Sequence, residues 1–455
     1  MSSSSLQSVR EGTARPRILL TDTNRWPLGP RLAIGFSGLG CDVSIVCPSP
    51  GHPAAKTRAM RQTLRYAGSR PLVSLKNAID AVSPDIILPL CDRSVQHLHA
   101  LHAKEVAENG SESKVARLIE RSLGAPESFE VLSSRYQLLE TARSEGIRVP
   151  EMVAIHSAAD LDRWCKQTPA PWVIKADGSW GGRGVRVVRT LSDAQQAWVE
   201  LSQRPTYVEL VKRLSLNRER AWILADWKHS RPSIMVQSHI HGRPANCAVV
   251  CWQGKLLAGI AVEVLQALGP TEPAIVVQVV EGKEMLRAAE LLAKRLNLSG
   301  FLGLDFMIEE GTGSAYLIEM NPRCTPPCPL ALGKGRDLLT ALQVKLANLP
   351  LKDRKPVTER TRITYFPRSG KSANEGAEPI PLESTYYDVP QGEPGLVQAL
   401  LHPWSLRSYL GQALDWARAT TVRKKALPTC VFEDALVSVK PEHAVDALPS
   451  ELRSS

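Results

Sequence analysis

Short apolar runs alternate with helical segments over the first 125 residues of the chain. Apolar runs bounded by polar residues predict buried strands at residues 17–22, 43–47 and 85–90. Helical segments are predicted between these strands, near residues 29–38 and 75–82. Strands that alternate with helices are typical of parallel βαβ units, so we expect an N-terminal doubly wound parallel α/β domain over residues 16–125.

Ligands of such sheets bind beyond the carboxyl ends of the strands. Those ends carry residues 22–25 (Asp-Thr-Asn-Arg) and residues 91–94 (Cys-Asp-Arg-Ser), which makes the two loops candidates for a substrate contact. Capping of the following helices by Asp and Ser is the alternative interpretation of the same residues. A dinucleotide site is not favoured, because no strict Gly-x-Gly-x-x-Gly follows the first strand.

The pattern changes after residue 125. A helix is predicted over residues 135–146, ending in glycine, and short strands with hairpin signals follow it, so residues 126–350 form a second unit. Residues 351–455 form a C-terminal extension, with a polar linker that bears Gly and Pro near residues 369–379.

Composition narrows the class of protein. Hydrophobic residues make up 43% and charged residues 22%, which excludes a collagen, a mainly disordered chain and a polytopic membrane protein. The formal charge of +10 permits anionic partners, but the basic residues are not interleaved with aromatic ones, so nucleic acid is not expected. No apolar run approaches the ~18 residues of a membrane span. Residues 1–15 are Ser-rich, are expected to be disordered and lack an apolar signal region, so the expected location is cytoplasmic, with no membrane partner.

The first segment with residues suited to binding or catalysis is 171–188. An apolar strand ends in Lys175, a glycine-rich loop follows, and a β-branched strand comes next. Glycines allow backbone N–H groups to converge on an anion, and a lysine leaving the strand neutralises phosphate oxygens. The loop residues that we assign to phosphate binding are Gly178, Ser179, Gly181, Gly182 and Gly184. A glycine-rich hairpin without a ligand is the alternative, since the spacing is not that of a P-loop.

The second segment is residues 303–323, in which two apolar strands flank Gly-Thr-Gly and predict an antiparallel hairpin. Asp305 and Glu319 are both seven residues from Thr312, so the hairpin places them opposite each other, with Asn321 on the same face. Three oxygen donors on one face suit Mg²⁺. Arg323, two residues further on, can hold a transferring phosphoryl group.

The alternative for this hairpin is a set of polar side chains on a solvated face. It is weakened because Asp305 and Glu319 would repel each other across the strands without a cation. Glu263, on a neighbouring apolar run, is the next candidate for a metal ligand.

Together, the strand-Lys-glycine loop and the Asp…Glu-x-Asn-Pro-Arg hairpin resemble the ATP-grasp superfamily. The resemblance covers roughly residues 130–345, and it implies ATP held between the antiparallel sheets of two α+β subdomains. It also implies one or two Mg²⁺ ions, with Mn²⁺ as a possible substitute. Residues 242–254 and 387–390 are similar to a bacterial ATP-grasp group for which we can name no substrate.

The resemblance assigns roles to individual residues. Lys175 and Arg135 would contact phosphates, and Asp305, Glu319 and Asn321 would bind the metal. Arg323 would face the γ-phosphate or an acyl phosphate, which makes Arg323 and Lys175 the expected catalytic residues. The adenine-binding hinge would be formed by Gln237, Ser238, His239 and Ile240. The chain has Ser238 where the family usually has Glu and lacks a second Glu that binds the ribose, a role for which Asn246 is the candidate.

Most enzymes of this kind are carboxylate–amine ligases, which form an acyl phosphate, ADP and phosphate. We therefore expect an ATP-dependent ligase acting on a small-molecule carboxylate and amine. One alternative is a bicarbonate-phosphorylating carboxylase or a carbamoyl-phosphate-type enzyme. Another is a non-catalytic protein that binds ATP or nucleic acid. Whether the protein forms a homodimer stays open.

Overall fold

The computed structural model describes residues 15–48, 51–178, 184–203, 232–267, 269, 273–350, 353–367 and 384–401. The predicted linker at residues 369–379 and almost all of the predicted disordered segment lie outside these ranges. In the described part of the chain, no helix is long and apolar enough to cross a membrane.

The N-terminal domain is the predicted parallel α/β domain. Its four-stranded sheet has the order β3-β2-β1-β4, and every neighbouring pair is parallel. The elements are β1 (Arg17–Thr21), α1 (Leu28–Gly38), β2 (Asp42–Cys47), β3 (Gln62–Arg65), α2 (Pro71–Val82), β4 (Ile86–Pro89), α3 (Asp92–Asn109) and α4 (Lys114–Leu123). Strand β3 was not predicted, because its residues Gln-Thr-Leu-Arg are mostly exposed and form no apolar run.

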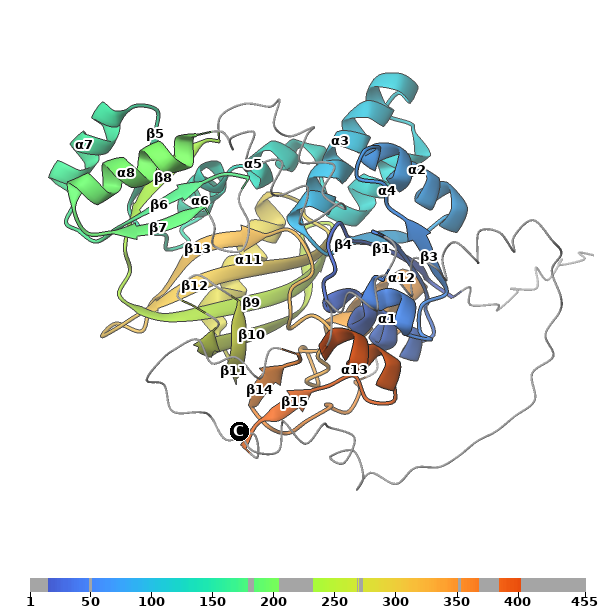
Figure 1. The fold of residues 1–455 in the computed structure, drawn as a ribbon. Coiled ribbons are helices and arrows are strands. Elements are labelled where there is room, and N and C mark those ends of the chain that lie inside the picture. Colours follow the sequence, from blue (N-terminus) through green and yellow to red (C-terminus); the bar gives the residue numbers. More distant parts are fainter. Residues whose placement is uncertain are drawn as a thin grey trace, which may run out of the picture.

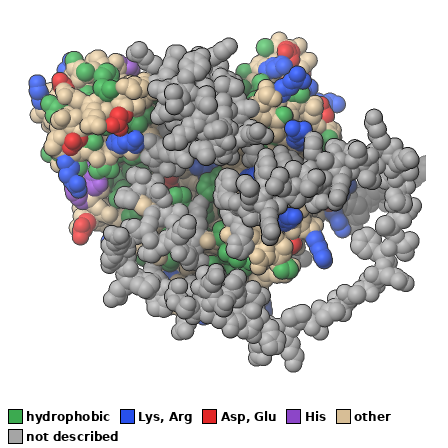
Figure 2. Space-filling model, in the orientation of Figure 1, with side chains coloured by type: hydrophobic (Ala, Val, Ile, Leu, Met, Phe, Trp, Pro, Cys, Tyr) green, Lys and Arg blue, Asp and Glu red, His purple; other side chains and the backbone are tan. Residues whose placement is uncertain are grey.

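A second, antiparallel sheet of four strands has the order β5-β8-β6-β7. Its elements, with two preceding helices, are α5 (Phe129–Ser133), α6 (Arg135–Ser144), β5 (Met152–Ile155), α7 (Ala158–Gln167), β6 (Trp172–Ala176), β7 (Val185–Val188), α8 (Leu191–Ser202) and β8 (Ile234–Ser238). Helices α7 and α8 cover its outer face around Ile174 and Val236 (Figure 1). On the visible face of this unit, basic, acidic and histidine side chains are interspersed (Figure 2).

The third sheet has seven strands in the order β13-β12-β9-β10-β11-β14-β15. Its elements are β9 (Gly242–Trp252), β10 (Lys255–Ala267), β11 (Ala274–Val280), α11 (Lys283–Arg295), β12 (Gly300–Glu309), β13 (Ala315–Asn321), α12 (Leu338–Ala347), β14 (Arg362–Tyr365) and β15 (Tyr386–Asp388). The sheet therefore continues beyond residue 350, where we drew the domain boundary from the sequence, and β14 and β15 form its far edge.

The N-terminal domain packs directly on this large sheet. Buried residues of both form one apolar cluster that includes Leu32 and Phe36 from α1, Val250 from β9 and Phe301 from β12. Helix α13 (Pro394–Leu401) lies beside α1 at the same interface (Figure 1). The first and third sheets thus share a core. The four-stranded antiparallel sheet packs one face on α7 and α8, and Met152 and Met235 join a further apolar cluster with α6, α11 and the large sheet.

A glycine makes one of the closest contacts across this interface. Gly124, which ends α4 with φ +112°, lies against the loop between α11 and β12. A β-carbon built on Gly124 would lie 2.5 Å from the carbonyl oxygen of Asn297 and 2.7 Å from the Cα of Leu298. The backbone here also forms two hydrogen bonds, from the N–H of Ala125 to Asn297 O and from the N–H of Ser299 to Leu123 O.

We therefore expect Gly124→Ala to lower the free energy of unfolding by about 2 kcal/mol more than Gly110→Ala does. Gly110 ends α3 with a similar backbone conformation (φ +77°), but its β-carbon would meet nothing within 4 Å. The difference therefore isolates the domain contact from the backbone strain. Chemical denaturation of both variants measures it, and equal losses would show that the contact at Gly124 has no energetic weight.

Candidate functional site

The predicted acidic pair is formed by a β-bulge. Asp305 on β12 pairs directly with Glu319 on β13, while the next pair towards the turn is Phe306 with Leu317. Ile318 is therefore the extra residue on β13. Without the bulge, Asp305 would lie opposite Ile318, and Glu319 would be displaced from the acidic pair.

Side chains that donate hydrogen bonds surround this pair. The Nδ2 of Asn246, opposite Asp305 on β9, lies 2.5 Å from Asp305 Oδ1, and the Nδ2 of Asn321 lies 2.9 Å from Asp305 Oδ2. Arg135, the first residue of α6, donates from Nε and Nη2 to Glu319 Oε1 at 3.2 and 2.9 Å. Burial alone would lower the pKa of Arg135, but the Glu319 carboxylate raises it above its ordinary value.

The sequence argument that a metal is needed to make the two carboxylates tolerable is therefore wrong as stated. Arg135 neutralises Glu319, and the two amides donate to Asp305. A residual cost is visible at Asp305, because burial and the neighbouring Glu319 raise its pKa to about 6. The sequence could not reveal this arrangement, because Arg135 is 184 residues away from Glu319.

Lys175, on β6, reaches the same edge of the large sheet. Its Nζ donates to the carbonyl oxygen of Ile318, the bulge residue, at 2.8 Å. The side chain is 4% exposed, and its burial lowers the pKa to about 8, partly opposed by Glu319. Within the described part of the chain, this carbonyl is the one hydrogen-bond partner of the buried ammonium group.

Arg323 follows the hairpin and joins it to the N-terminal domain. Its Nε donates to Asp92 Oδ1 at 2.9 Å and its Nη2 to Asn321 Oδ1 at 3.0 Å. Burial alone would lower the pKa of Arg323, but Asp92 raises it. Asp92 belongs to the loop that the sequence marked as a possible substrate contact, but its contact with Arg323 was not foreseen.

The glycine loop is only partly described. It leaves the sheet after Ala176, whose N–H donates to the carbonyl of Gly184 at 2.9 Å where the chain returns. Gly178 has φ +71°, and its β-carbon position is open. Ser179, Gly181 and Gly182 lie outside the described residues, so their phosphate-binding role stays a prediction.

The predicted hinge continues from β8. Gln237 shares a sheet face with Lys175, because Gln237 pairs with Val173, two residues before Lys175 on β6. Gln237 is 3% exposed, and among the described residues its Oε1 and the Nδ1 of His239 are buried without a partner. The backbone N–H groups of Ser238 and His239 already donate to Glu151 O and Pro171 O.

Two unsatisfied polar atoms at one strand end fit a ligand with both a donor and an acceptor edge, such as a purine base. Ile240 has an apolar side chain that forms no hydrogen bonds, so its role in the hinge stays a prediction. Asn246 lies with the acidic pair and donates to Asp305, so a ribose contact for Asn246 stays a prediction.

Glu263, the next candidate for a metal ligand, lies away from the acidic pair. Glu263 pairs with Ala245 and therefore faces the opposite side of the sheet from Asn246 and Asp305, where it contacts Arg243. That excludes Glu263 as a ligand at this site.

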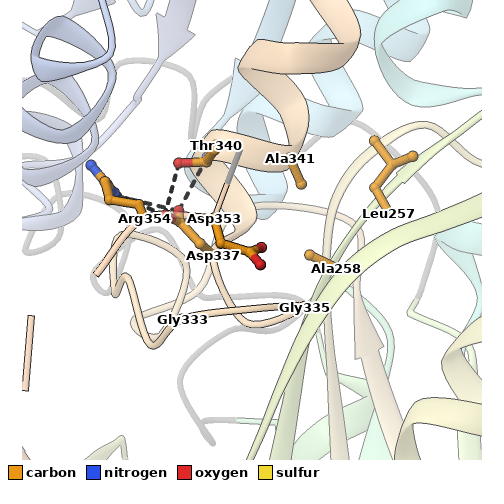
Figure 3. Close-up of a pocket in the computed structure, with 9 residues that line it drawn as sticks. All are labelled: Leu257, Ala258, Gly333, Gly335, Asp337, Thr340, Ala341, Asp353 and Arg354. Carbon is orange, nitrogen blue, oxygen red and sulfur yellow. Dashed lines mark hydrogen bonds and ion pairs between the residues drawn. The ribbon is translucent and has the colours of Figure 1, made fainter. Parts of the chain in front are cut away.

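A small pocket lies between β10 and the start of α12 (Figure 3). Its polar side chains already form hydrogen bonds with one another, since Thr340 and Arg354 both donate to Asp337.

The described residues contain no cluster of three or more His, Cys, Asp or Glu side chains suited to a metal ion. The hairpin supplies two carboxylates and one amide oxygen, which are hard donors of the kind that Mg²⁺ prefers. Remaining coordination positions would then belong to waters or to a substrate. The donor set therefore fits a metal that is shared with a bound ligand.

Comparison with known proteins agrees with this geometry. A family model described as the ATP-grasp domain matches residues 140–256. A carbamoyl phosphate synthase large chain from Thermomicrobium roseum is 25% identical over 259 residues, covering 54% of this chain and 22% of that relative. This chain thus corresponds to less than a quarter of its curated relative's length.

Solved structures share the fold at low identity. The biotin carboxylase domain of 2-oxoglutarate carboxylase from Hydrogenobacter thermophilus has a TM-score of 0.52 at 16% identity, covering 75% of this chain and 71% of that one. Biotin carboxylase from Campylobacter jejuni has a TM-score of 0.52 at 15% identity, with 74% and 72% covered. An ADP complex of N5-carboxyaminoimidazole ribonucleotide synthetase has a TM-score of 0.51 at 15% identity, with 74% and 79% covered.

The fold is therefore an N-terminal parallel α/β domain followed by the two antiparallel sheets of an ATP-grasp fold. Residues 140–256 match the ATP-grasp domain, in agreement with the resemblance that the sequence motifs indicated. Six predicted site residues lie where the two antiparallel sheets and the N-terminal domain meet: Arg135, Lys175, Asp305, Glu319, Asn321 and Arg323. Their chemical roles remain predictions.

Since Arg135 and a divalent cation would compete for Glu319, removing Arg135 should strengthen metal binding in the absence of nucleotide. We expect Arg135→Gln to raise the affinity for Mn²⁺ alone about tenfold, the order of one charge-assisted hydrogen bond. Arg143→Gln, on the same helix but paired with Glu140 at the surface, is the matched control. Electron paramagnetic resonance of free Mn²⁺ measures both variants, and an unchanged affinity in Arg135→Gln would contradict the competition.

Proposed function

We propose that this protein is an ATP-dependent ligase that activates a small-molecule carboxylate as an acyl phosphate and joins it to an amine. One observation carries the proposal: three cations from three parts of the fold converge beside the Asp305–Glu319 pair. Arg135 donates to Glu319 itself, Lys175 donates to the neighbouring carbonyl of Ile318, and Arg323 donates to Asn321. An in-line phosphoryl transfer needs this combination of convergent cations and metal-binding carboxylates.

Each residue of the site would have a separate role in phosphoryl transfer. Lys175 and Arg135 bind phosphate oxygens of ATP, and the glycine loop covers them. Asp305, Glu319 and Asn321 hold Mg²⁺, which neutralises phosphate charge when it is bound. Arg323 stabilises the charge on the transferring phosphoryl group.

The buried Gln237 Oε1 and His239 Nδ1 support adenine at the hinge, because each lacks a partner in the described chain. The γ-phosphoryl group passes from ATP to a carboxylate oxygen, leaving ADP. The amine then attacks the acyl carbon, the bond from that carbon to the phosphate oxygen breaks, and phosphate leaves. The chain's own contribution is positioning and charge neutralisation, so no covalent intermediate with a side chain is required.

Bicarbonate is the second candidate for the acid, and the names of the similar proteins favour it. They include biotin carboxylases, one of which was solved with bicarbonate, and a carbamoyl phosphate synthase. With bicarbonate the same transfer would produce carboxyphosphate. A cytoplasmic location stays a prediction, and so does dimer formation; the biotin carboxylase domain from Hydrogenobacter thermophilus was solved as a dimer.

Nucleotide binding should depend on Lys175. We expect Lys175→Ala to weaken Mg·ATP binding at least tenfold, since a hydrogen bond to a charged group contributes ~1.5–3 kcal/mol. Lys166→Ala, which removes an exposed lysine from α7 of the same unit, should leave the affinity unchanged. Titration calorimetry on folded protein decides, and equal affinities in the two variants would remove Lys175 from the site.

The same lysine predicts a pH dependence. With its pKa lowered to about 8 by burial, Lys175 is protonated below pH 8 and loses its proton above that pH. Phosphate oxygens bind the protonated form, so Mg·ATP affinity should fall by up to about tenfold per pH unit above pH 8. Lys175→Arg, which keeps its charge, should lack this decline. A wild-type affinity that is flat between pH 7 and pH 9.5 would contradict the lowered pKa.

The function itself is tested by ATP-dependent phosphate release in the presence of carboxylates and amines, with mass spectrometry of the products. Release that requires both a carboxylate and an amine supports the ligase. Release with bicarbonate alone moves the assignment to carboxyphosphate chemistry. ATP binding without turnover for any acid would leave a non-catalytic ATP-binding protein, the class of alternative that the sequence kept open.

A further inference from the structure

The carboxylate of Asp92 connects the N-terminal domain with Arg323, one of the two predicted catalytic residues. Asp92 is the first residue of α3, just beyond the carboxyl end of β4. Its Oδ1 accepts the hydrogen bond from Arg323 Nε at 2.9 Å, and both side chains are largely shielded, at 24% and 18% exposure. The backbone is held at the same place, because the N–H of Cys324 donates to the carbonyl of Pro89 at 3.1 Å.

Two carboxylates, those of Asp92 and Asp305, attract the guanidinium group of Arg323. Asn321 bridges Arg323 to Asp305, accepting from the guanidinium through Oδ1 and donating to Asp305 through Nδ2. Without Asp92, the attraction of Asp305 would be unopposed, and the guanidinium would be drawn toward the predicted metal ligands.

We propose that Asp92 is a positioning residue, which holds Arg323 away from Asp305 so that its remaining N–H groups serve the transferring phosphoryl group. The proposal rests on the proposed function. It makes phosphoryl transfer depend on the docking of the N-terminal domain, which also carries the loops expected to contact the acid. A purely structural ion pair would stabilise the domain interface without affecting the phosphoryl group.

An isosteric substitution separates the two possibilities. Asp92→Asn removes the charge but keeps the size and a polar group. The readout is the affinity for Mg·ADP with aluminium fluoride, which mimics the transferring phosphoryl group, divided by the affinity for Mg·ADP alone. We expect Asp92→Asn to lower this ratio about tenfold while Mg·ADP affinity stays the same. Asp92→Glu, which restores the charge, should recover part of the ratio.

A double-mutant cycle tests whether Asp92 acts through Arg323. Arg323→Ala should lower the ratio as well, and adding Asp92→Asn to it should cause no further loss. Additive losses would overturn the proposal, and so would an unchanged ratio in Asp92→Asn. The control is Asp388→Asn, which breaks the more deeply buried ion pair between α1 and β15 through Arg31. A similar fall of the ratio in this control would assign the effect to loosened domain packing.

A second measurement does not depend on nucleotide. Phenylglyoxal modifies accessible arginines, and peptide mass spectrometry gives the rate at each position. Asp92→Asn should raise the rate at Arg323 several-fold and leave Arg31 unchanged, whereas Asp388→Asn should do the reverse. If the wild-type protein bound Mg·ADP no more tightly with aluminium fluoride, the proposed function would fail. The modification rates alone would then decide whether Asp92 holds Arg323, and an unchanged rate at Arg323 would overturn the proposal.

Discussion

The constraint on which this site depends is the juxtaposition of two carboxylates on neighbouring strands. Asp305 and Glu319 lie opposite each other on β12 and β13, and such a pair is destabilising unless positive charge or hydrogen-bond donors compensate it. The surrounding side chains supply both, through the guanidinium of Arg135 and the amides of Asn246 and Asn321. The groups predicted to bind phosphate and metal are thus hydrogen-bonded to one another, so ligand binding would have to exchange partners within this network.

Edge strand β13 is where this network joins the parts of the fold. The four-stranded antiparallel sheet contacts it through Lys175 and the carbonyl of Ile318, and α6 contacts it through Arg135 and Glu319. Apolar packing supports both neighbours of the large sheet. The N-terminal domain shares one buried cluster with it, and α6, β5 and β8 share another. Since phosphate oxygens can replace a carbonyl or a carboxylate as partners of Lys175 and Arg135, we expect the polar contacts at β13, rather than the apolar clusters, to respond to a nucleotide.

Sequence reasoning succeeded where a local pattern carried the information. The apolar runs and glycines predicted the parallel domain, the β6–β7 hairpin and the β12–β13 hairpin, and the motifs predicted the ATP-grasp domain that residues 140–256 match. The pairing of Asp305 with Glu319 was also predicted correctly, but from a symmetry about Thr312 that took no account of the bulge at Ile318. Strand β3 was missed because a short exposed edge strand has no apolar run. Glu263, named as the next candidate for a metal ligand, lies on the opposite face from Asp305, because the register of β10 against β9 decides its face.

The sequence by itself determined which residues we predict to carry the chemistry: a lysine at a strand end before a glycine loop, and carboxylates, an amide and an arginine around one hairpin. Hydrophobic periodicity and turn residues act over a few positions, so they could specify these elements and their order. Only the tertiary structure decided which charges neutralise one another, because Arg135 meets Glu319 and Asp92 meets Arg323 across 184 and 231 residues of chain. Such long-range ion pairs depend on how three sheets pack together, and no local pattern encodes that packing.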